Sequence, residues 1–165
     1  MKKTIAGIAL VVLLLAATGA GVQSASADPT LQSAGGFGQI HLGLPFRNFA
    51  FSATTSSDGT TSGQAQIENR SSGFRAHIQI DCLNVLDNVA VMSGVWTSSN
   101  LPSIPVGSDA FFAVQDNGEG PSAPADDEIT LGFSGLGIPC TFVTDPAPLA
   151  PFFVPIESGQ IQVRS

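Results

Sequence analysis

The sequence predicts an all-β protein, built as a single antiparallel β-barrel or β-sandwich of about eight to ten strands with one disulfide. Two observations carry this prediction. Short apolar runs recur between turn-forming residues about every ten positions. No stretch after residue 27 repeats its apolar positions with the period of an amphipathic helix. We therefore expect residues 28–165 to form one all-β domain.

The first 27 residues have the composition of a secretory signal peptide. Lys2 and Lys3 form a positive start, residues 5–17 are apolar or small, and Ala25-Ser26-Ala27 is a small-x-small cleavage site. The apolar run is shorter than the roughly 20 residues of a membrane-spanning helix. We expect cleavage near Ala27, so that residues 28–165 are exported, and the short Met-Lys-Lys start favours a bacterial source.

In the first half of the chain, strands are expected at residues 39–44, 48–53, 63–68, 74–82 and 89–96. The clearest is 74–82, because apolar residues at even positions alternate with polar residues at odd positions. This alternation places Cys82 on the core face, with Ile78 and Ile80. Residues 83–86 are expected to continue this strand after a kink. Residues 89–96 carry apolar side chains on both faces, so both faces should be partly buried.

In the second half, strands are expected at residues 110–114, 129–133 and 140–143, and Ile161 and Val163 mark a closing strand. Between them, residues 145–155 contain four prolines, which exclude a helix interior or a central strand. This segment is expected to be a loop that lays aromatic side chains on the sheet. The apolar side chains that would either pack there or contact a ligand or partner are Leu149, Phe152 and Phe153.

Two cysteines, Cys82 and Cys140, lie in a chain that is expected to be exported. An even number of cysteines in an oxidising compartment favours a disulfide. They do not form a C-x-x-C pair, so the spacing does not indicate a redox motif. We predict a structural Cys82–Cys140 bridge.

The charge balance restricts the partners of this protein. Beyond residue 27 no lysine remains, and four arginines stand against 13 acidic residues, which gives a formal net charge of −9. Such a protein repels polyanions, so neither nucleic acid nor an anionic membrane surface is an expected partner. No second apolar segment predicts membrane insertion after signal cleavage.

One acidic segment is a candidate cation site, because calcium binds oxygen ligands on adaptable loops. Its spacing does not match an EF-hand, and the alternative is a solvated acidic hairpin that protects a sheet edge. No other cofactor is indicated. The candidate ligands are Asp116, Asn117, Glu119, Asp126, Asp127 and Glu128.

Recognisable catalytic patterns are not found in the sequence. It has two histidines, His41 and His77, and each is expected on the wet face of a strand. There is no nucleophile elbow, phosphate-binding loop or zinc-protease motif. An enzyme is therefore not the favoured interpretation, and no catalytic residue is assigned.

Two segments resemble each other, Gly63-Gln64-Ala65-Gln66-Ile67 and Gly159-Gln160-Ile161-Gln162-Val163. A true internal repeat would recur at a constant period over more residues. We interpret both as strands with glutamines facing water and apolar residues facing the core.

The runs Cys82-Leu83-Asn84-Val85 and Val114-Gln115-Asp116-Asn117-Gly118 carry a resemblance to known proteins. Together with the strand that follows the first run, they resemble a loosely defined group of small secreted bacterial β proteins. The resemblance implies a compact all-β barrel or sandwich and a structural turn at Asp116-Asn117-Gly118. It carries over no functional residues.

The leading functional hypothesis is an exported, non-enzymatic binding or surface-interaction protein, with an unknown protein or a small apolar molecule as its partner. One alternative is a small barrel that carries an apolar ligand. The side chains that could line its cavity are Trp96, Phe111, Phe112, Phe133 and Phe142. The other alternative is a secreted hydrolase with an unrecognised site.

Overall fold

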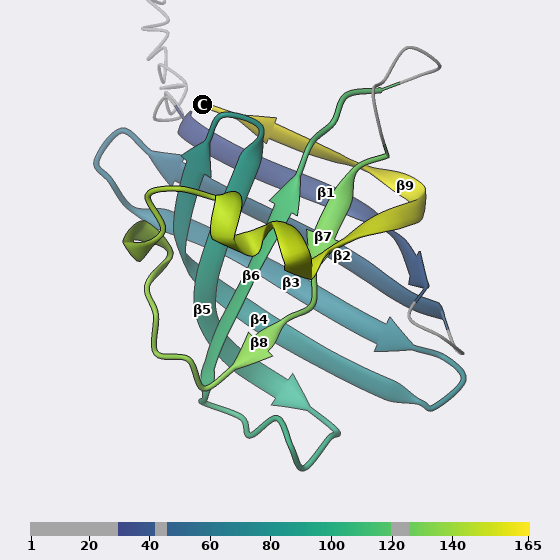
Figure 1. Ribbon diagram of the computed structural model, residues 1–165. Helices are drawn as coiled ribbons and strands as arrows, with labels where there is room; N and C mark the ends of the chain where they lie inside the picture. Colours follow the sequence, from purple (N-terminus) through teal and green to yellow (C-terminus); the bar gives the residue numbers. More distant parts are fainter. Residues whose placement is uncertain (1–29, 42–45, 120–125) are drawn as a thin grey trace, which may run out of the picture.

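The computed structural model describes residues 30–41, 46–119 and 126–165, and the predicted signal peptide lies outside these residues. The described chain forms nine strands and two short 3-10 helices (Figure 1). The first five strands are β1 (Thr30–His41), β2 (Phe46–Ser56), β3 (Thr61–Asn69), β4 (Phe74–Leu86) and β5 (Val89–Ser99). The remaining elements are β6 (Asp109–Gln115), β7 (Glu128–Thr130), β8 (Phe133–Ser134), η1 (Cys140–Phe142), η2 (Ala147–Phe152) and β9 (Phe153–Arg164).

The strands close into an antiparallel barrel, which decides between the two predicted architectures. Each of β1 to β6 pairs with its neighbour in sequence, β6 pairs with β7, and β9 joins β7 to β1. β7 and β8 both pair with β6, so together they fill one position of the barrel. The predicted strand at residues 129–133 is thus two short strands interrupted at Leu131 and Gly132.

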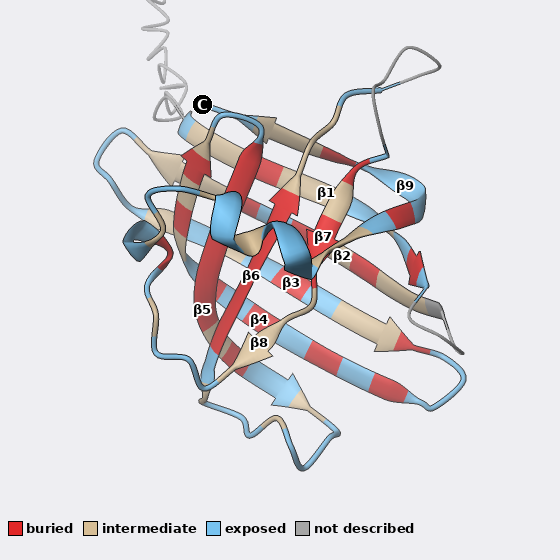
Figure 2. Ribbon diagram, in the orientation of Figure 1, coloured by how far each residue is buried: buried red, intermediate tan, exposed pale blue. Residues whose placement is uncertain are grey.

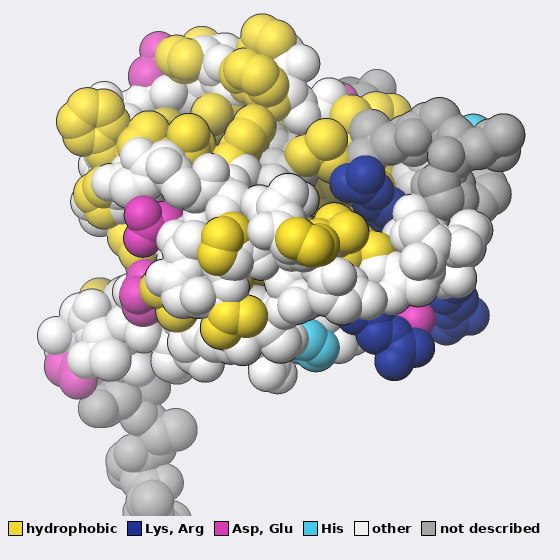
Figure 3. Space-filling view, turned by 90° about the horizontal axis from the view of Figure 1, so that it is seen from below, with side chains coloured by type: hydrophobic (Ala, Val, Ile, Leu, Met, Phe, Trp, Pro, Cys, Tyr) yellow, Lys and Arg dark blue, Asp and Glu magenta, His cyan; other side chains and the backbone are white. Residues whose placement is uncertain are grey.

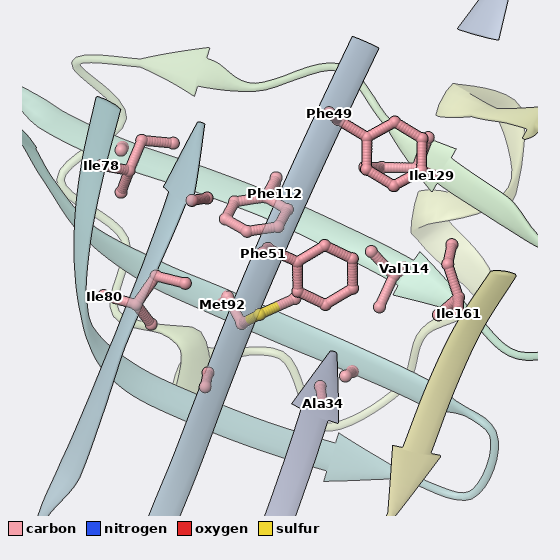
Figure 4. Close-up of a cluster of buried hydrophobic side chains, with 14 of the residues drawn as sticks. Ala34, Phe49, Phe51, Ile78, Ile80, Met92, Phe112, Val114, Ile129 and Ile161 are labelled. Carbon is pink, nitrogen blue, oxygen red and sulfur yellow. The ribbon is translucent and has the colours of Figure 1, made fainter. Parts of the chain in front are cut away.

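Side chains alternate between the barrel interior and the outside, as the period of a strand requires (Figure 2). On β4, Phe74, Ala76, Ile78 and Ile80 are buried and the residues between them are exposed. The interior is packed around aromatic rings (Figure 4). Phe51 contacts Phe112 edge to face, with ring centroids 5.9 Å apart.

The first strand, expected at residues 39–44, begins already at Thr30, so Gly35 and Gly36 lie in the middle of β1. A Cβ at Gly36 would come within 2.8 Å of the Gln160 carbonyl oxygen and 2.9 Å of the Phe51 ring. Gly36 fits here because the interior leaves no space for a side chain. Composition alone does not distinguish such a glycine from one in a turn.

A β-bulge on β4 reverses the predicted orientation of Cys82. Ile80 pairs with Gly94 and Cys82 with Ser93, so Asp81 is an extra residue in the ladder. Beyond the bulge Leu83 enters the barrel core, whereas Cys82 packs in a second apolar cluster outside the barrel. The sequence predicts the kink before residue 83, but it does not predict that the kink turns the Cys82 side chain out of the barrel.

Residues 135–152, here called the strap, cross the outer face of β5 and β6 (Figure 1). The predicted disulfide joins the strap to β4 through Cys82 and Cys140. The Cys140 N–H also donates to the Ser93 hydroxyl over 3.1 Å, and the Asn84 side-chain amide donates to the Val143 carbonyl over 2.8 Å. The predicted strand at 140–143 is instead the 3-10 helix η1, in which the Phe142 N–H donates to the Pro139 carbonyl and the Val143 N–H to the Cys140 carbonyl.

The strap explains why β5 and β6 are apolar on both faces, as expected for residues 89–96. Their inner side chains belong to the barrel core, and their outer ones to the cluster under the strap. The outer cluster is centred on Val89, Val91, Phe111, Ala113 and Cys140.

The disulfide indicates a non-reducing environment for the folded protein. Among the described residues, no helix has the length and apolar character needed to cross a membrane.

Replacing both Cys82 and Cys140 by alanine is expected to lower stability and loosen the strap. The two residues are 58 positions apart, and the chain-entropy model gives about 4 kcal/mol for a loop of this length. Urea denaturation should show a lower midpoint, and limited proteolysis should cut the strap before the barrel. Unfolded wild-type protein should contain no titratable thiol. An unchanged midpoint in the double variant would contradict the structural role of the bridge.

Candidate functional site

The barrel interior is filled by side chains. Its described cavities measure about 20 and 60 Å³, whereas ligand pockets typically measure about 300–1,000 Å³. The larger cavity is lined in part by Trp96, whose buried indole N–H has no hydrogen-bond partner in the described structure. A cavity of this size accommodates ordered water but not a lipid or a pigment.

The five aromatic residues expected to line a ligand cavity are distributed over three environments. Trp96 and Phe112 lie in the barrel core. Phe111 and Phe133 lie in the outer cluster under the strap. Phe142 is 76% exposed on η1. They therefore do not form one cavity.

The apolar residues predicted at the proline-rich loop mostly pack against the barrel. Leu149 and Phe153 join the outer cluster. Phe152 is 51% exposed, and its ring meets Phe133 edge to face at 5.6 Å. Hydrophobic side chains also gather at the top of Figure 3, on the side that carries the strap. Leu149 and Phe153 thus pack on the sheet as expected for this loop, whereas Phe152 remains largely exposed.

The predicted acidic segment closes the barrel. Asp127 is buried, and its carboxylate accepts hydrogen bonds from the N–H groups of Asn117 at 2.9 Å and Ile161 at 2.7 Å. The Asp116 carboxylate accepts from the N–H groups of Gly118 and Val163, both at 3.0 Å. β9 pairs with β7 only over Phe153 to Pro155, so these carboxylates supply acceptors where no strand does.

Two of the other proposed calcium ligands, Asn117 and Glu119, also have side-chain partners. The Asn117 amide donates to the Asp126 carbonyl at 2.8 Å, and Glu119 accepts from the Gln162 amide at 3.0 Å. Glu128 lies in β7. Among the described residues, no three side chains of metal-ligating type converge on one point.

The two histidines lie on the outer surface. His41 Nδ1 lies 3.2 Å from a carboxylate oxygen of Glu157. The His77 ring forms no hydrogen bond or ion pair with the described residues, and its neighbour across the β3–β4 pair is Gln66. On β5 the residue opposite His77 is Ser98, but no hydrogen bond joins the two side chains and no acid orients the ring among the described residues, so no nucleophile–base–acid arrangement is formed there.

On the outer face of β9, β1, β2, β3 and β4, residues align in two rows, and most of them are polar. The pairing register places one residue of each strand in each row. The first row is Gln162, Gly35, Ser52, Gln64 and Gln79. The second row is Gln160, Phe37, Ala50, Gln66 and His77.

Two hollows lie on this face and meet at Ser52. One measures about 260 Å³ and lies over β9, β1 and β2. The other measures about 290 Å³ and lies over β2, β3 and β4. We call the pair the amide trough, because four glutamines line it: Gln64, Gln66, Gln160 and Gln162.

The glutamines of the trough differ in how they are held. Gln162 accepts from Arg164 at 3.1 Å and donates to Glu119 at 3.0 Å, so its amide is fixed. Gln64, Gln66 and Gln160 are exposed, and their side chains form no hydrogen bond with the described residues. These amides are free to bind a molecule in the trough.

The sequence carried a signal for this site, in the two similar segments at residues 63–67 and 159–163. Alternation correctly placed their glutamines outside. It did not indicate that β3 and β9 share one face, since that depends on the intervening β1 and β2.

Comparison of the chain with protein-family models, with curated proteins and with solved structures found no match.

The substitution Asp127→Asn is expected to destabilise the protein by about 1–3 kcal/mol, because an amide oxygen replaces only one of two acceptors and leaves a buried N–H unpaired. The matched control is Asp126→Asn, since Asp126 is exposed and no hydrogen bond to its carboxylate is found in the described structure. Thermal and urea denaturation of both variants measure the difference. Equal midpoints for the two variants would refute the role of Asp127 in closing the barrel.

Proposed function

We propose that this protein is an exported binding protein whose contact surface is the outer face of its barrel. Export is supported by the signal-peptide composition of residues 1–27 and by the disulfide. Binding at the outer face is supported by one observation above all: among the described residues the barrel interior holds no cavity of ligand size, whereas a trough with free amide groups lies outside.

The other candidate functions have less support. A carrier of an apolar ligand needs an interior cavity much larger than the 60 Å³ described. A hydrolase needs a nucleophile activated by a base, and His77 has no such partner among the described residues. Nucleic acid is not an expected partner, because 13 acidic residues oppose four arginines beyond residue 27.

Export is testable with the full chain in a bacterial host. The expected result is protein in the culture medium that begins at or near Asp28 and contains no free thiol. N-terminal sequencing and thiol titration measure both properties. Retention of the unprocessed chain inside the cell would contradict the export half of the proposal.

Binding is testable with the protein immobilised and three probes in solution: a neutral polysaccharide, a phage-displayed peptide library and phosphatidylcholine vesicles. Wild-type protein should bind at least one probe, and Gly35→Phe should lose that binding because the ring fills the trough. A Cβ at Gly35 meets only the Phe51 carbonyl at 3.8 Å, so the fold should tolerate the change. The control, Thr141→Phe, places the same ring on the strap. The proposal fails if no probe is bound, or if Gly35→Phe binds like wild type.

A further inference from the structure

We propose that the amide trough binds a stretch of neutral polysaccharide. This inference rests on the proposed binding function and names the chemical class of its ligand. Four properties of the trough support it: its hydrogen-bonding groups, its exposed ring, its dimensions and its charge.

The hydrogen-bonding groups of the trough match a polyhydroxylated ligand. A glutamine amide carries two N–H donors and a carbonyl acceptor in one plane. Neighbouring hydroxyls of a sugar ring both donate and accept, so one amide can bond two of them at once. Gln64, Gln66 and Gln160 present such amides without a partner among the described residues.

An exposed aromatic ring lies among these amides. Phe37 is 58% exposed on β1 and stands in the same row as Gln160 and Gln66. The face of an aromatic ring is negative, and the axial C–H groups of a pyranose are weakly positive and apolar. A sugar ring can therefore lie on Phe37 while its hydroxyls reach the flanking amides.

The dimensions of the trough favour an extended chain over a single sugar. It crosses five strands, which at the usual interstrand spacing corresponds to about 19 Å. Its floor is formed by small residues, Gly35, Ala50 and Ser52. The free amides lie on β9 and on β3, with the Phe37 ring and the small floor residues between them, so a ligand that contacts both groups of amides has to extend over several strands.

The charge of the trough favours a neutral ligand. Its single arginine, Arg164, donates to Gln162, which in turn donates to the Glu119 carboxylate. At the neighbouring position of β3 and β4, Arg75 pairs with Glu68 at 3.1 Å. Arg70 also lies 3.9 Å from the Glu68 carboxylate, so two arginines share one acid at this end of the face. Arg164 is the one arginine among the residues that line the trough itself, so an acidic polymer finds little counter-charge within it.

A peptide is less suited to this surface. Peptides that bind sheets usually add a strand to an open edge and form main-chain hydrogen bonds. The described strands close into a barrel, and the trough crosses them instead of following one. The hydrogen-bonding groups of the trough belong to side chains and not to the backbone of a strand edge. Such groups suit a ligand rich in hydroxyls better than the main chain of a peptide.

Affinity electrophoresis tests the proposal, with native gels that contain hydroxyethyl cellulose, dextran or galactomannan. At least one of these neutral polymers should retard the wild-type protein, and the retardation should persist at high salt because no ion pair is involved. Alginate, an acidic polymer, should not retard it. The inference is overturned if none of the neutral polymers retards the protein, or if alginate alone does.

Two substitutions locate the site. Phe37→Ala removes the ring, and Gln66→Glu removes two donors without changing the shape of the side chain. Each should weaken binding about tenfold or more. The matched controls are Phe142→Ala, an exposed ring on the strap, and Gln39→Glu, an exposed glutamine outside the trough. Thermal midpoints close to wild type establish that all four variants are folded.

The outcomes separate this inference from the proposed function. If the controls weaken binding as much as the trough variants, the trough is not the glycan site. If only the peptide library or the vesicles are captured, and Gly35→Phe abolishes that capture, the glycan inference fails and the binding function stands. If no probe of any class is bound, both fail.

Discussion

The closure of the barrel at β9 is the constraint on which the rest of this structure depends. β9 pairs with β1 along most of its length but with β7 over only three positions. The N–H groups of Ile161 and Val163 would lack acceptors there without the carboxylates of Asp127 and Asp116. A buried unpaired N–H costs roughly 1–3 kcal/mol. The acidic segment thus lets a closed barrel form around one core without a full-length eighth strand, and this structural use accounts for the carboxylates of Asp116 and Asp127.

A second constraint comes from the outer face of β5 and β6, which is as apolar as the inner face. Exposed to water, this face would be an extended hydrophobic patch next to a barrel that is already full. The strap covers it, and the disulfide holds the strap in place. The bulge at Asp81 is what allows this, because it turns Cys82 outward while Leu83 continues the core. The continuous core along β4 and the Cys82–Cys140 disulfide therefore both depend on one extra residue, Asp81.

The filled interior also has a consequence for function. Small barrels either bind a ligand inside or pack the interior with side chains, and this one is packed around Phe51 and Phe112. A ligand would therefore have to bind at the outer surface of the barrel. On that surface β1 and β2 contribute small side chains at Gly35 and Ser52, and longer amides flank them, so the hollow arises from a difference in side-chain length across neighbouring strands.

The sequence by itself determined the all-β class, the alternation that buries Ile78 and Ile80, the two buried faces of residues 89–96 and the Cys82–Cys140 pair. These follow from local periodicity and from an even count of cysteines. The tertiary structure alone decided that the sheet closes, that Cys82 faces outward, and that glutamines about a hundred residues apart share one trough. The physical reason is that alternation states which side chains share a face of a strand but not which strand lies beside it. Register, bulges and closure depend on contacts between distant residues, and the candidate site is built from those contacts.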